Sequence, residues 1–181
     1  MTRLRLIPPA KSDAAAWAAW RNEPLGRRFN PLKPSAIEVL ERRLEACSSD
    51  LRDRTVSEYR WMMEYGGELI GTVALSGLSW SMGYAEISYW LAEAFHGRGL
   101  GSRAVAMLLD LVFAESELER LSALISRENL ASKRLIERLG FTLEGCLREH
   151  YLIQGRRVDV LVYGLLRREW ASPASDPRTF A

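Results

Sequence analysis

A glycine-rich loop is the segment whose residue types and spacing most clearly suggest chemistry. It reads His96-Gly97-Arg98-Gly99-Leu100-Gly101 and lies between a strand-like segment, residues 84–91, and an apolar stretch typical of a helix, residues 102–115. The first N–H groups of a helix have no intrahelical partner, and glycines let an anion approach the backbone closely. We therefore expect the amides of residues 97–102 to form a diphosphate site. A plain glycine-rich turn is the alternative.

Two common nucleotide-binding motifs do not fit this loop. A P-loop needs a Lys followed by Ser or Thr, and the loop contains no Lys. The dinucleotide fingerprint needs glycines spaced G-x-G-x-x-G near the start of a fold unit, whereas Gly97, Gly99 and Gly101 are spaced evenly and lie in mid-chain. The loop therefore predicts a phosphate ligand of another class.

Composition narrows the class of protein. The chain has 181 residues with 25 Lys+Arg against 23 Asp+Glu, a net charge of +2, which is too small to indicate a nucleic-acid binder. Its length suits one domain. Cys47 and Cys146 have neither disulfide-framework nor metal-ligand spacing, so we expect no metal and a reducing, cytoplasmic environment. No apolar run is long enough for a membrane span, and the first residues lack a signal-peptide pattern.

The elements that must position the loop follow from hydrophobic periodicity and from turn residues. Residues 1–170 are expected to form the domain and residues 171–181 a flexible tail. The predicted order is β-α-α-β-β-β-α-β-α-β-β, with Pro24 ending the first helix and a Gly/Ser-bearing loop over 76–83. The predicted strands are 3–7, 59–64, 69–75, 84–91, 121–125, 141–148 and 158–166, and the predicted helices are 12–21, 36–46, 102–115 and 131–139.

The ordered set of motifs resembles one enzyme superfamily. The strand Glu86-Ile87-Ser88-Tyr89-Trp90-Leu91, the glycine loop, Asn129-Leu130-Ala131-Ser132 and Gly140-Phe141 before Glu144-Gly145 together are similar to the GNAT acyl-CoA N-acyltransferases. The resemblance is closest to the RimJ/RimL-like branch, which acetylates α-amino groups of ribosomal proteins and other amines. It covers nearly the whole chain. It implies an α/β single domain with a mostly antiparallel central sheet, a splayed strand pair and flanking helices.

The resemblance implies acetyl-CoA as co-substrate and assigns residues to it. The family's phosphate loop begins with Gln or Arg, where this chain has His96. The strand end splays from its neighbour, so that the pantetheine arm can pair with its edge and a strand N–H can polarise the thioester carbonyl. The implied CoA-binding residues are Tyr89, Trp90, Leu91, His96, Gly97, Arg98, Gly99, Leu100, Gly101, Ser102, Asn129, Ser132 and Arg134.

Two residues are candidates for catalysis. Glu86 lies beside the expected splay and matches the family's acidic strand position, so it is the candidate base that deprotonates the amine, directly or through water. An outward-facing Glu paired with an Arg is the alternative. The resemblance also implies that the Ser132 hydroxyl protonates the leaving thiolate, although Asn129 and Ser132 are equally suited to cap a helix. No covalent enzyme intermediate is expected.

Other residues have weaker claims. Trp20, Arg21, Phe29 and His150 are candidates for the acceptor wall, while Cys146 is interpreted as a small core residue. The predicted function is transfer of an acetyl group to a primary amine, with a protein N-terminus as one acceptor. A polyamine or aminoglycoside acceptor, which would favour an acidic cleft, a succinyl-CoA donor and a non-catalytic CoA-binding, ribosome-associated module stay open. Dimers are common among relatives, so a homodimer also stays open.

Overall fold

The computed structural model describes residues 3–33 and 35–171. The predicted division into a domain, 1–170, and a tail, 171–181, stays a prediction, because residues 172–181 lie outside this part. The strands are β1 (Leu4–Ile7), β2 (Tyr59–Tyr65), β3 (Glu68–Ser79), β4 (Tyr84–Leu91), β5 (Arg120–Ser126), β6 (Thr142–Ile153) and β7 (Arg156–Leu166). The helices are α1 (Ala14–Arg21), α2 (Pro24–Phe29), α3 (Ile37–Glu45), α4 (Leu100–Glu115) and α5 (Leu130–Arg138), with 3₁₀ turns η1 (Lys11–Asp13), η2 (Glu93–Phe95) and η3 (Arg167–Glu169).

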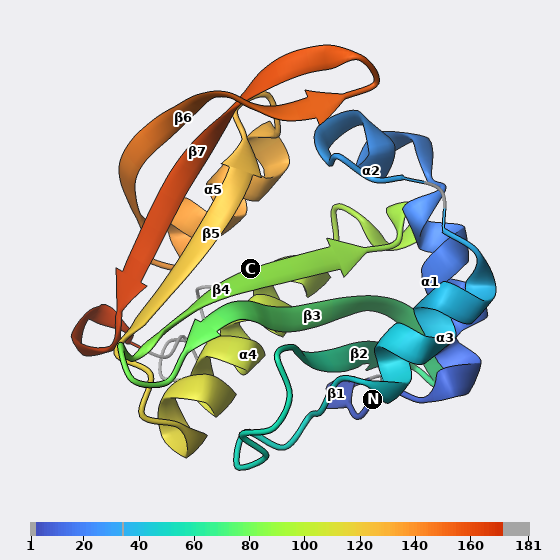
Figure 1. Cartoon of the computed structure of the whole chain (residues 1–181), viewed down its shortest axis with the longest axis horizontal. Helices are drawn as coiled ribbons and strands as arrows, with labels where there is room; N and C mark the ends of the chain where they lie inside the picture. Colours follow the sequence, from blue (N-terminus) through green and yellow to red (C-terminus); the bar gives the residue numbers. More distant parts are fainter. Residues whose placement is uncertain (1–2, 34, 172–181) are drawn as a thin grey trace.

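The described strands form one seven-stranded sheet in the order β1-β2-β3-β4-β5-β7-β6. All neighbours are antiparallel except β4 and β5, which run parallel. This parallel pair is connected through α4, as a crossover requires. The mostly antiparallel sheet with flanking helices that the sequence predicted is confirmed (Figure 1).

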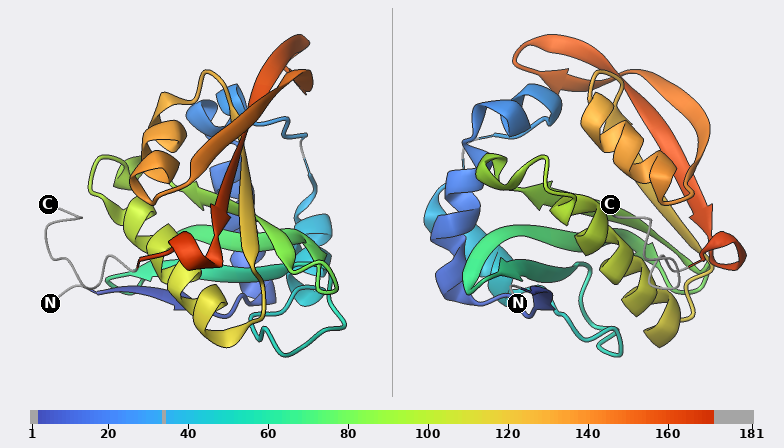
Figure 2. Two further views of the ribbon diagram at one scale, coloured as in Figure 1. Left: turned by 90° about the vertical axis from the view of Figure 1, so that its left-hand side faces the viewer. Right: turned by 180° about the vertical axis from the view of Figure 1, so that it is seen from behind.

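Helices cover both faces of the sheet, because its strands carry apolar side chains on both faces. Leu108, Leu109 and Val112 of α4 are fully buried against one face, and α5 lies on the same side (Figure 2). Trp17 and Trp20 of α1 pack with α3 against the opposite face. Each buried side chain of this size contributes about 1.5–3 kcal/mol through removal of apolar surface from water. No helix within the described residues is long and apolar enough to cross a membrane.

The structure departs from the sequence prediction at three places. The first helix does end at Arg21, before Pro24, but the sequence prediction missed α2, which begins at Pro24 because proline at the first helical position forgoes no hydrogen bond. Residues 76–79 continue β3 through a register shift instead of forming a loop. The last two strands extend to a two-residue turn at Gln154 and Gly155, whose φ angles of 50° and 80° suit a tight hairpin.

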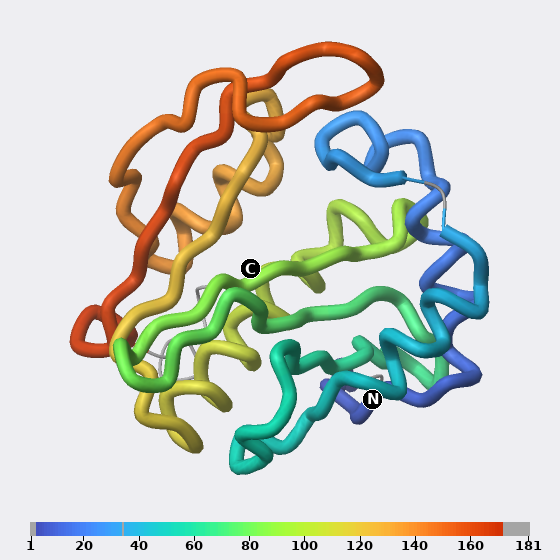
Figure 3. Tube along the Cα trace, in the orientation of Figure 1, coloured from blue at the N-terminus to red at the C-terminus, as the bar shows by residue number. Residues whose placement is uncertain are grey.

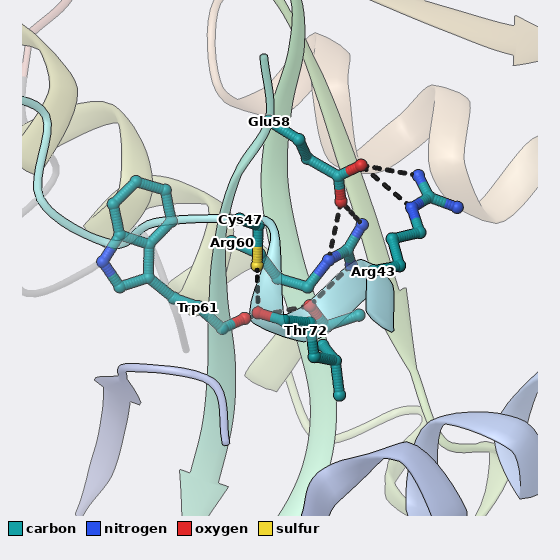
Figure 4. Close-up of polar contacts among 7 residues, drawn as sticks. Arg43, Cys47, Glu58, Arg60, Trp61 and Thr72 are labelled. Carbon is teal, nitrogen blue, oxygen red and sulfur yellow. Dashed lines mark hydrogen bonds and ion pairs between the residues drawn. The ribbon is translucent and has the colours of Figure 1, made fainter. Parts of the chain in front are cut away.

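A buried arginine joins α3 to the sheet (Figure 4). The Arg60 side chain is 6% exposed. Its Nη1 donates to Thr72 Oγ1 at 2.9 Å, and its Nε donates to Glu58 Oε1 at 2.9 Å. Arg43 of α3 donates to the other oxygen of Glu58, and the Arg60 guanidinium lies 4.3 Å from the centroid of the Trp17 ring. Removing one partner of such a group leaves a buried charge without compensation.

We predict that Glu58→Gln lowers the free energy of unfolding by about 2–3 kcal/mol, the typical value of hydrogen bonds to charged groups. Burial by itself raises the pKa of Glu58, but Arg60 and Arg43 outweigh it and the pKa is lowered. The carboxylate therefore stabilises the fold above its ordinary pKa, and this stabilisation is lost as the pH falls through the lowered pKa. Urea denaturation at several pH values measures both effects.

The matched control is Glu64→Gln, which breaks the Arg5–Glu64 pair, where the Arg5 side chain is 58% exposed. Solvent screening limits this loss to within about 1 kcal/mol. Equal losses in the two variants would contradict the structural role of Glu58.

Candidate active site

The glycine loop forms the junction between β4 and α4. After Leu91 the chain forms η2, and residues 96–99 are exposed before α4 begins. Gly99 caps the helix with φ 69°, a left-handed conformation that L side chains rarely adopt. The loop is therefore shaped by the backbone freedom of its glycines rather than by burial of its side chains.

Six consecutive amides of this loop are available as donors. The first helical bond of α4 runs from the Arg103 N–H to the Gly99 carbonyl at 3.1 Å. Within the described residues, none of the N–H groups of 97–102 donates to a protein acceptor. These donors lie at the positive end of a 16-residue helix, so the geometry fits an anion such as a diphosphate.

The side chains of His96 and Arg98 hold the loop against the preceding residues through contacts with backbone carbonyls. A ring nitrogen of His96, Nε2, lies 2.8 Å from the Leu91 carbonyl oxygen. Arg98 donates to the Ala94 carbonyl at 3.2 Å, and its guanidinium lies 5.3 Å from the Phe95 ring centroid. His96, which stands where the family has Gln or Arg, thus ties the loop to the end of β4.

The splay of β4 from β5 is the central feature of the site. The two strands pair only at Tyr84–Arg120, Ala85–Leu121 and Glu86–Ser122. Beyond this point β4 continues along β3 and β5 continues along β7, and the two strands diverge (Figure 1). Residues 87–91 of β4 therefore have no strand partner on the β5 side.

Glu86 lies where the two strands separate. Its neighbours Ala85 and Ile87 are buried in the core with α4, so strand alternation places Glu86 on the opposite face, together with Ser88 and Trp90. Burial raises the pKa of the Glu86 carboxyl, while the charge of His150 opposes this shift. Burial and the charge of Glu86 likewise raise the pKa of Tyr151. Glu86 on β4 and the pair His150 and Tyr151 on β6 are thus close enough for charge on one to shift the pKa of another.

A bulge in β6 turns His150 and Tyr151 toward this face. Leu147 pairs with Val160 and Tyr151 with Val158, so residues 148–150 stand opposite one residue of β7, Asp159. Adjacent strand residues normally point to opposite faces, but the rings of His150 and Tyr151 are 5.4 Å apart between centroids. The bulge, with φ 52° at Glu149, removes the alternation.

Asp159 holds this bulge. Its Oδ1 accepts the Glu149 N–H at 2.9 Å, and its Oδ2 accepts from Arg127 Nη1 at 3.1 Å. Both bonds are made by the ionised carboxylate, and together they lower the pKa of Asp159. Asp159 therefore positions the strand segment that carries His150.

The start of α5 lies across the splay. Asn129 caps the helix by accepting the Ser132 N–H at 3.1 Å, which is the capping arrangement that the sequence allowed. The Tyr89 hydroxyl donates to the Ser132 carbonyl at 3.5 Å, and burial raises its pKa to about 12. Tyr89 thus joins β4 to α5, while Arg134 is exposed on the same helix.

The predicted acceptor wall is only partly brought together. Trp20 is 7% exposed and lies in the core, while Arg21 donates to the Lys33 carbonyl at 3.5 Å. Phe29 is half-buried, with Arg28 at 5.3 Å from its ring centroid. His150 lines a cavity of about 530 Å³ between the segment around α2 and the β6–β7 hairpin, whereas Trp20, Arg21 and Phe29 do not.

Two glutamates link α2 to the glycine loop. Glu93 of η2 accepts the Leu25 N–H at 2.7 Å, and Glu23 accepts the Glu93 N–H at 3.3 Å. Each carboxylate thus caps the first turn of the other segment. Gly26 allows the close approach that this requires, because a Cβ there would lie 1.6 Å from a Trp90 ring carbon.

Several of these residues were missed by sequence reasoning. Tyr151, Asp159 and the reciprocal pair Glu23 and Glu93 act through contacts between distant segments, and none lies in a local motif. Gln154-Gly155 was the available signal, because a tight hairpin turn in a long strand pair suggests a bulge that adjusts register.

Cys146 is exposed on the edge strand β6, so its interpretation as a core residue is wrong. Among the described residues no group of His, Cys, Asp and Glu could hold a metal ion.

Comparison with known families now identifies the chain's relationship. Residues 3–142 match the family model described as the acetyltransferase (GNAT) domain. The chain belongs to the GNAT acetyltransferase family. The resemblance inferred from the glycine loop and the strand before it is thereby confirmed.

Relatives of this GNAT chain include proteins named for different acetyl acceptors. It is 38% identical over 170 residues, 93% of the chain and 96% of the relative, to the uncharacterized N-acetyltransferase p20 of Bacillus licheniformis. It is 37% identical over 106 residues to the putative ribosomal N-acetyltransferase YdaF of Bacillus subtilis, covering 59% of the chain and 58% of YdaF. It is 26% identical over 132 residues, 71% of each chain, to the spermidine N(1)-acetyltransferase of Escherichia coli.

Solved structures share the fold of this GNAT domain. A crystal structure of a probable acetyltransferase matches with a TM-score of 0.79 and 28% identity over 92% of the chain and 94% of that structure. RimJ of Mycobacterium smegmatis, solved in complex with CoA-disulfide, matches with a TM-score of 0.75 and 25% identity over 93% of the chain and 83% of that structure.

We predict that Asp159→Ala makes the Glu149 amide exchange with solvent several-fold faster, because the carboxylate that accepts its proton is gone. Asp159→Asn is the matched control, since it keeps an acceptor oxygen and should stay near the wild type. In the wild type, the neutral carboxyl that forms as the pH falls through the lowered pKa of Asp159 also keeps an acceptor oxygen, so the Glu149 amide should stay protected there, as in the asparagine variant. Hydrogen exchange followed by NMR measures all three. Unchanged exchange in the alanine variant would show that other contacts hold the bulge.

Proposed function

We propose that this chain is an acetyl-CoA-dependent N-acetyltransferase that transfers the acetyl group directly to a primary amine, above all a protein N-terminal α-amino group. One observation carries the proposal. The free edge of β4, residues 87–91, connects a loop of six available amides with the partly buried carboxylate of Glu86. The names of relatives, including a putative ribosomal N-acetyltransferase, support the same reaction.

The donor half of the site is assigned to the loop and the splay. The amides of residues 97–102 hold the diphosphate, with Arg98 and Arg134 beside it. The pantetheine arm pairs with the edge formed by Tyr89, Trp90 and Leu91, and the Asn129 amide donates to it from across the splay. RimJ of Mycobacterium smegmatis, solved with CoA-disulfide, supports a CoA ligand for this fold.

The acceptor amine is assigned to the face of β4 that carries Glu86. An amine reaches the enzyme as an ammonium ion and must lose a proton before its nitrogen can attack the thioester carbonyl. A base works best when its pKa lies near the working pH, and burial shifts Glu86 in that direction. An α-amino group, with a pKa of about 7.7–8.0, needs less help than a Lys side chain at about 10.4.

The reaction then proceeds without a covalent intermediate on the enzyme. A β4 N–H stabilises the oxyanion that forms when the nitrogen adds to the carbonyl carbon. As the carbon–sulfur bond breaks, the thiolate takes a proton, for which Ser132 is the proposed donor. The products are an N-acetylated amine and free CoA. We place the enzyme in the cytoplasm, where CoA donors and free thiols such as Cys47 and Cys146 coexist; a homodimer stays a prediction.

We predict that Gly99→Asp abolishes stabilisation by acetyl-CoA, because it puts a side chain and a negative charge among the donor amides at φ 69°. At about 100 times its Kd the ligand stabilises the wild type by about 2.7 kcal/mol, which raises Tm by about 5–10 °C in a chain of this size. Gly67→Asp is the control: it has the same kind of strain at φ 85° in the β2–β3 turn and open space around it. A full thermal shift in Gly99→Asp would refute the proposed diphosphate position.

We predict that Glu86→Gln lowers kcat about 100-fold or more, the usual contribution of a positioned base, and leaves the Kd of acetyl-CoA nearly unchanged. In the wild type kcat should rise as the pH increases through the raised pKa of Glu86, since only the carboxylate accepts a proton. This limb should be absent in the variant. Thiol release measured across pH tests both, with Glu64→Gln as a remote carboxylate control. An identical pH profile in Glu86→Gln would remove Glu86 as the base.

A further inference from the structure

The cavity beside His150 has a cationic wall. It has a volume of about 530 Å³ and lies between the segment that follows α1 and the tip of the β6–β7 hairpin, which extends over α2 (Figure 3). Its lining includes two permanent cations and no carboxylate. The lining residues are Arg27, Asn30, Pro31, Leu32, Lys33, His150, Tyr151, Leu152, Ile153, Gln154 and Gly155.

The positive charge of this wall is not compensated locally. Within the described residues, neither Arg27 nor Lys33 has a carboxylate within ion-pair distance. The carboxylate nearest in sequence, Glu23, instead accepts the Glu93 N–H. The two framing segments, 21–33 and 148–157, together carry a net charge of +5, although the whole chain carries +2. The cations behind this count are Arg21, Arg27, Arg28, Lys33, Arg148, Arg156 and Arg157, and the anions are Glu23 and Glu149. Of these cations, Arg156 is paired with Glu128, and it does not line the cavity.

The cavity shares two side chains with the surroundings of Glu86, the proposed site of the amine. His150 and Tyr151 line it, and the same two side chains interact electrostatically with Glu86. An acceptor whose nitrogen lies at Glu86 would therefore extend past these two rings into the cationic cavity. Its volume lies within the range of ligand pockets, about 300–1,000 Å³, so it can hold a short peptide segment.

We propose that the acceptor is a peptide amino terminus followed by acidic side chains, whose carboxylates bind Arg27 and Lys33. The inference rests on the proposed function and deepens it by naming the chemical class of the acceptor. A guanidinium and an ammonium group attract carboxylates and repel further cations. A polyamine, which places a second positive charge beyond the reacting amine, is the wrong partner for this wall.

The same anion chemistry could come from the donor, because a succinyl group also carries a carboxylate. The two sources differ in which reactant should lose affinity when the cations are reversed. If the carboxylates belong to the acceptor, reversing the charges of Arg27 and Lys33 should change the KM for the peptide at constant acetyl-CoA. If the carboxylate belongs to a succinyl donor, the same reversal should change the KM for succinyl-CoA and leave transfer from acetyl-CoA unaffected.

The test compares two peptides that share an amino-terminal alanine and have either two aspartates or two arginines at the next positions. With acetyl-CoA, the wild type should prefer the acidic peptide at least about tenfold in kcat/KM, equivalent to about 1.4 kcal/mol. The preference should lie in KM, because the cavity holds ground state and transition state alike. It should shrink at an ionic strength of about 1 M, where the Debye length falls to about 3 Å.

The variant is Arg27→Glu combined with Lys33→Glu, and it should reverse the preference toward the basic peptide and spermidine. Arg28→Glu is the matched control, since it changes the same charge on the same helix outside the cavity lining. A retained acetyl-CoA thermal shift shows that both proteins are folded. Equal use of the two peptides by the wild type, or a preference for spermidine, would overturn the inference. A double variant that affects only succinyl-CoA would overturn it in favour of the donor.

A binding experiment without turnover distinguishes failure of this inference from failure of the proposed function. Fluorescence anisotropy of the same peptides, labelled at the carboxyl end, reports preference without turnover. If no amine releases thiol from acetyl-CoA, the proposed function fails. Tighter binding of the acidic peptide, reversed in the double variant, would still support the cationic site, and equal binding of both peptides would reject it.

Discussion

The short parallel pairing between β4 and β5 is the constraint on which the site depends. Only three residues of each strand pair, and the last pair is Glu86 with Ser122. Past that pair, β3 pairs with one edge of β4 and β7 with one edge of β5, while the two edges that face each other have no strand partner. The strands can diverge without leaving a buried unpaired ladder on their outer sides. The edge between them is the place where an extended ligand can bind as a strand would.

The other parts of the site lie around the point where β4 and β5 diverge. The glycine loop follows the free end of β4, and α5 begins where β5 ends, so donor amides and the cap formed by Asn129 face each other across the gap. Glu86 lies at the closed end of the gap, where β4 and β5 still pair. The Tyr89 hydroxyl spans from β4 to the Ser132 carbonyl and limits how far the two sides separate. A change in the splay would therefore move the proposed diphosphate site and the proposed base, Glu86, relative to each other.

The acceptor side is coupled to the donor side through backbone caps rather than through ion pairs. Glu23 and Glu93 each accept an N–H from the other's segment, which ties the cationic cavity wall around Arg27 to the start of the glycine loop. Their like charges repel, and burial together with that repulsion raises the pKa of Glu23. The molecule thus uses carboxylates here as hydrogen-bond acceptors and leaves the neighbouring cations available to a ligand.

The sequence by itself determined the family, the order of the main elements and the donor loop. These depend on local signals: glycines at positive φ, helix-capping residues and apolar periodicity, which are all contained in short windows of sequence. Tertiary structure alone decided the acceptor side. Tyr151 reaches the face of Glu86 because a bulge held by Asp159 cancels strand alternation, and Arg27 reaches the cavity that Tyr151 lines on α2, a helix that begins at Pro24 and that the sequence did not predict. Such contacts join residues 65 or more positions apart, Glu86 with Tyr151 and Arg27 with the β6–β7 hairpin, and no local pattern encodes their distance. The glycine loop proposed to bind phosphate could thus be predicted from spacing, whereas the charge of the proposed acceptor cavity emerged only when two distant segments were brought together by the fold.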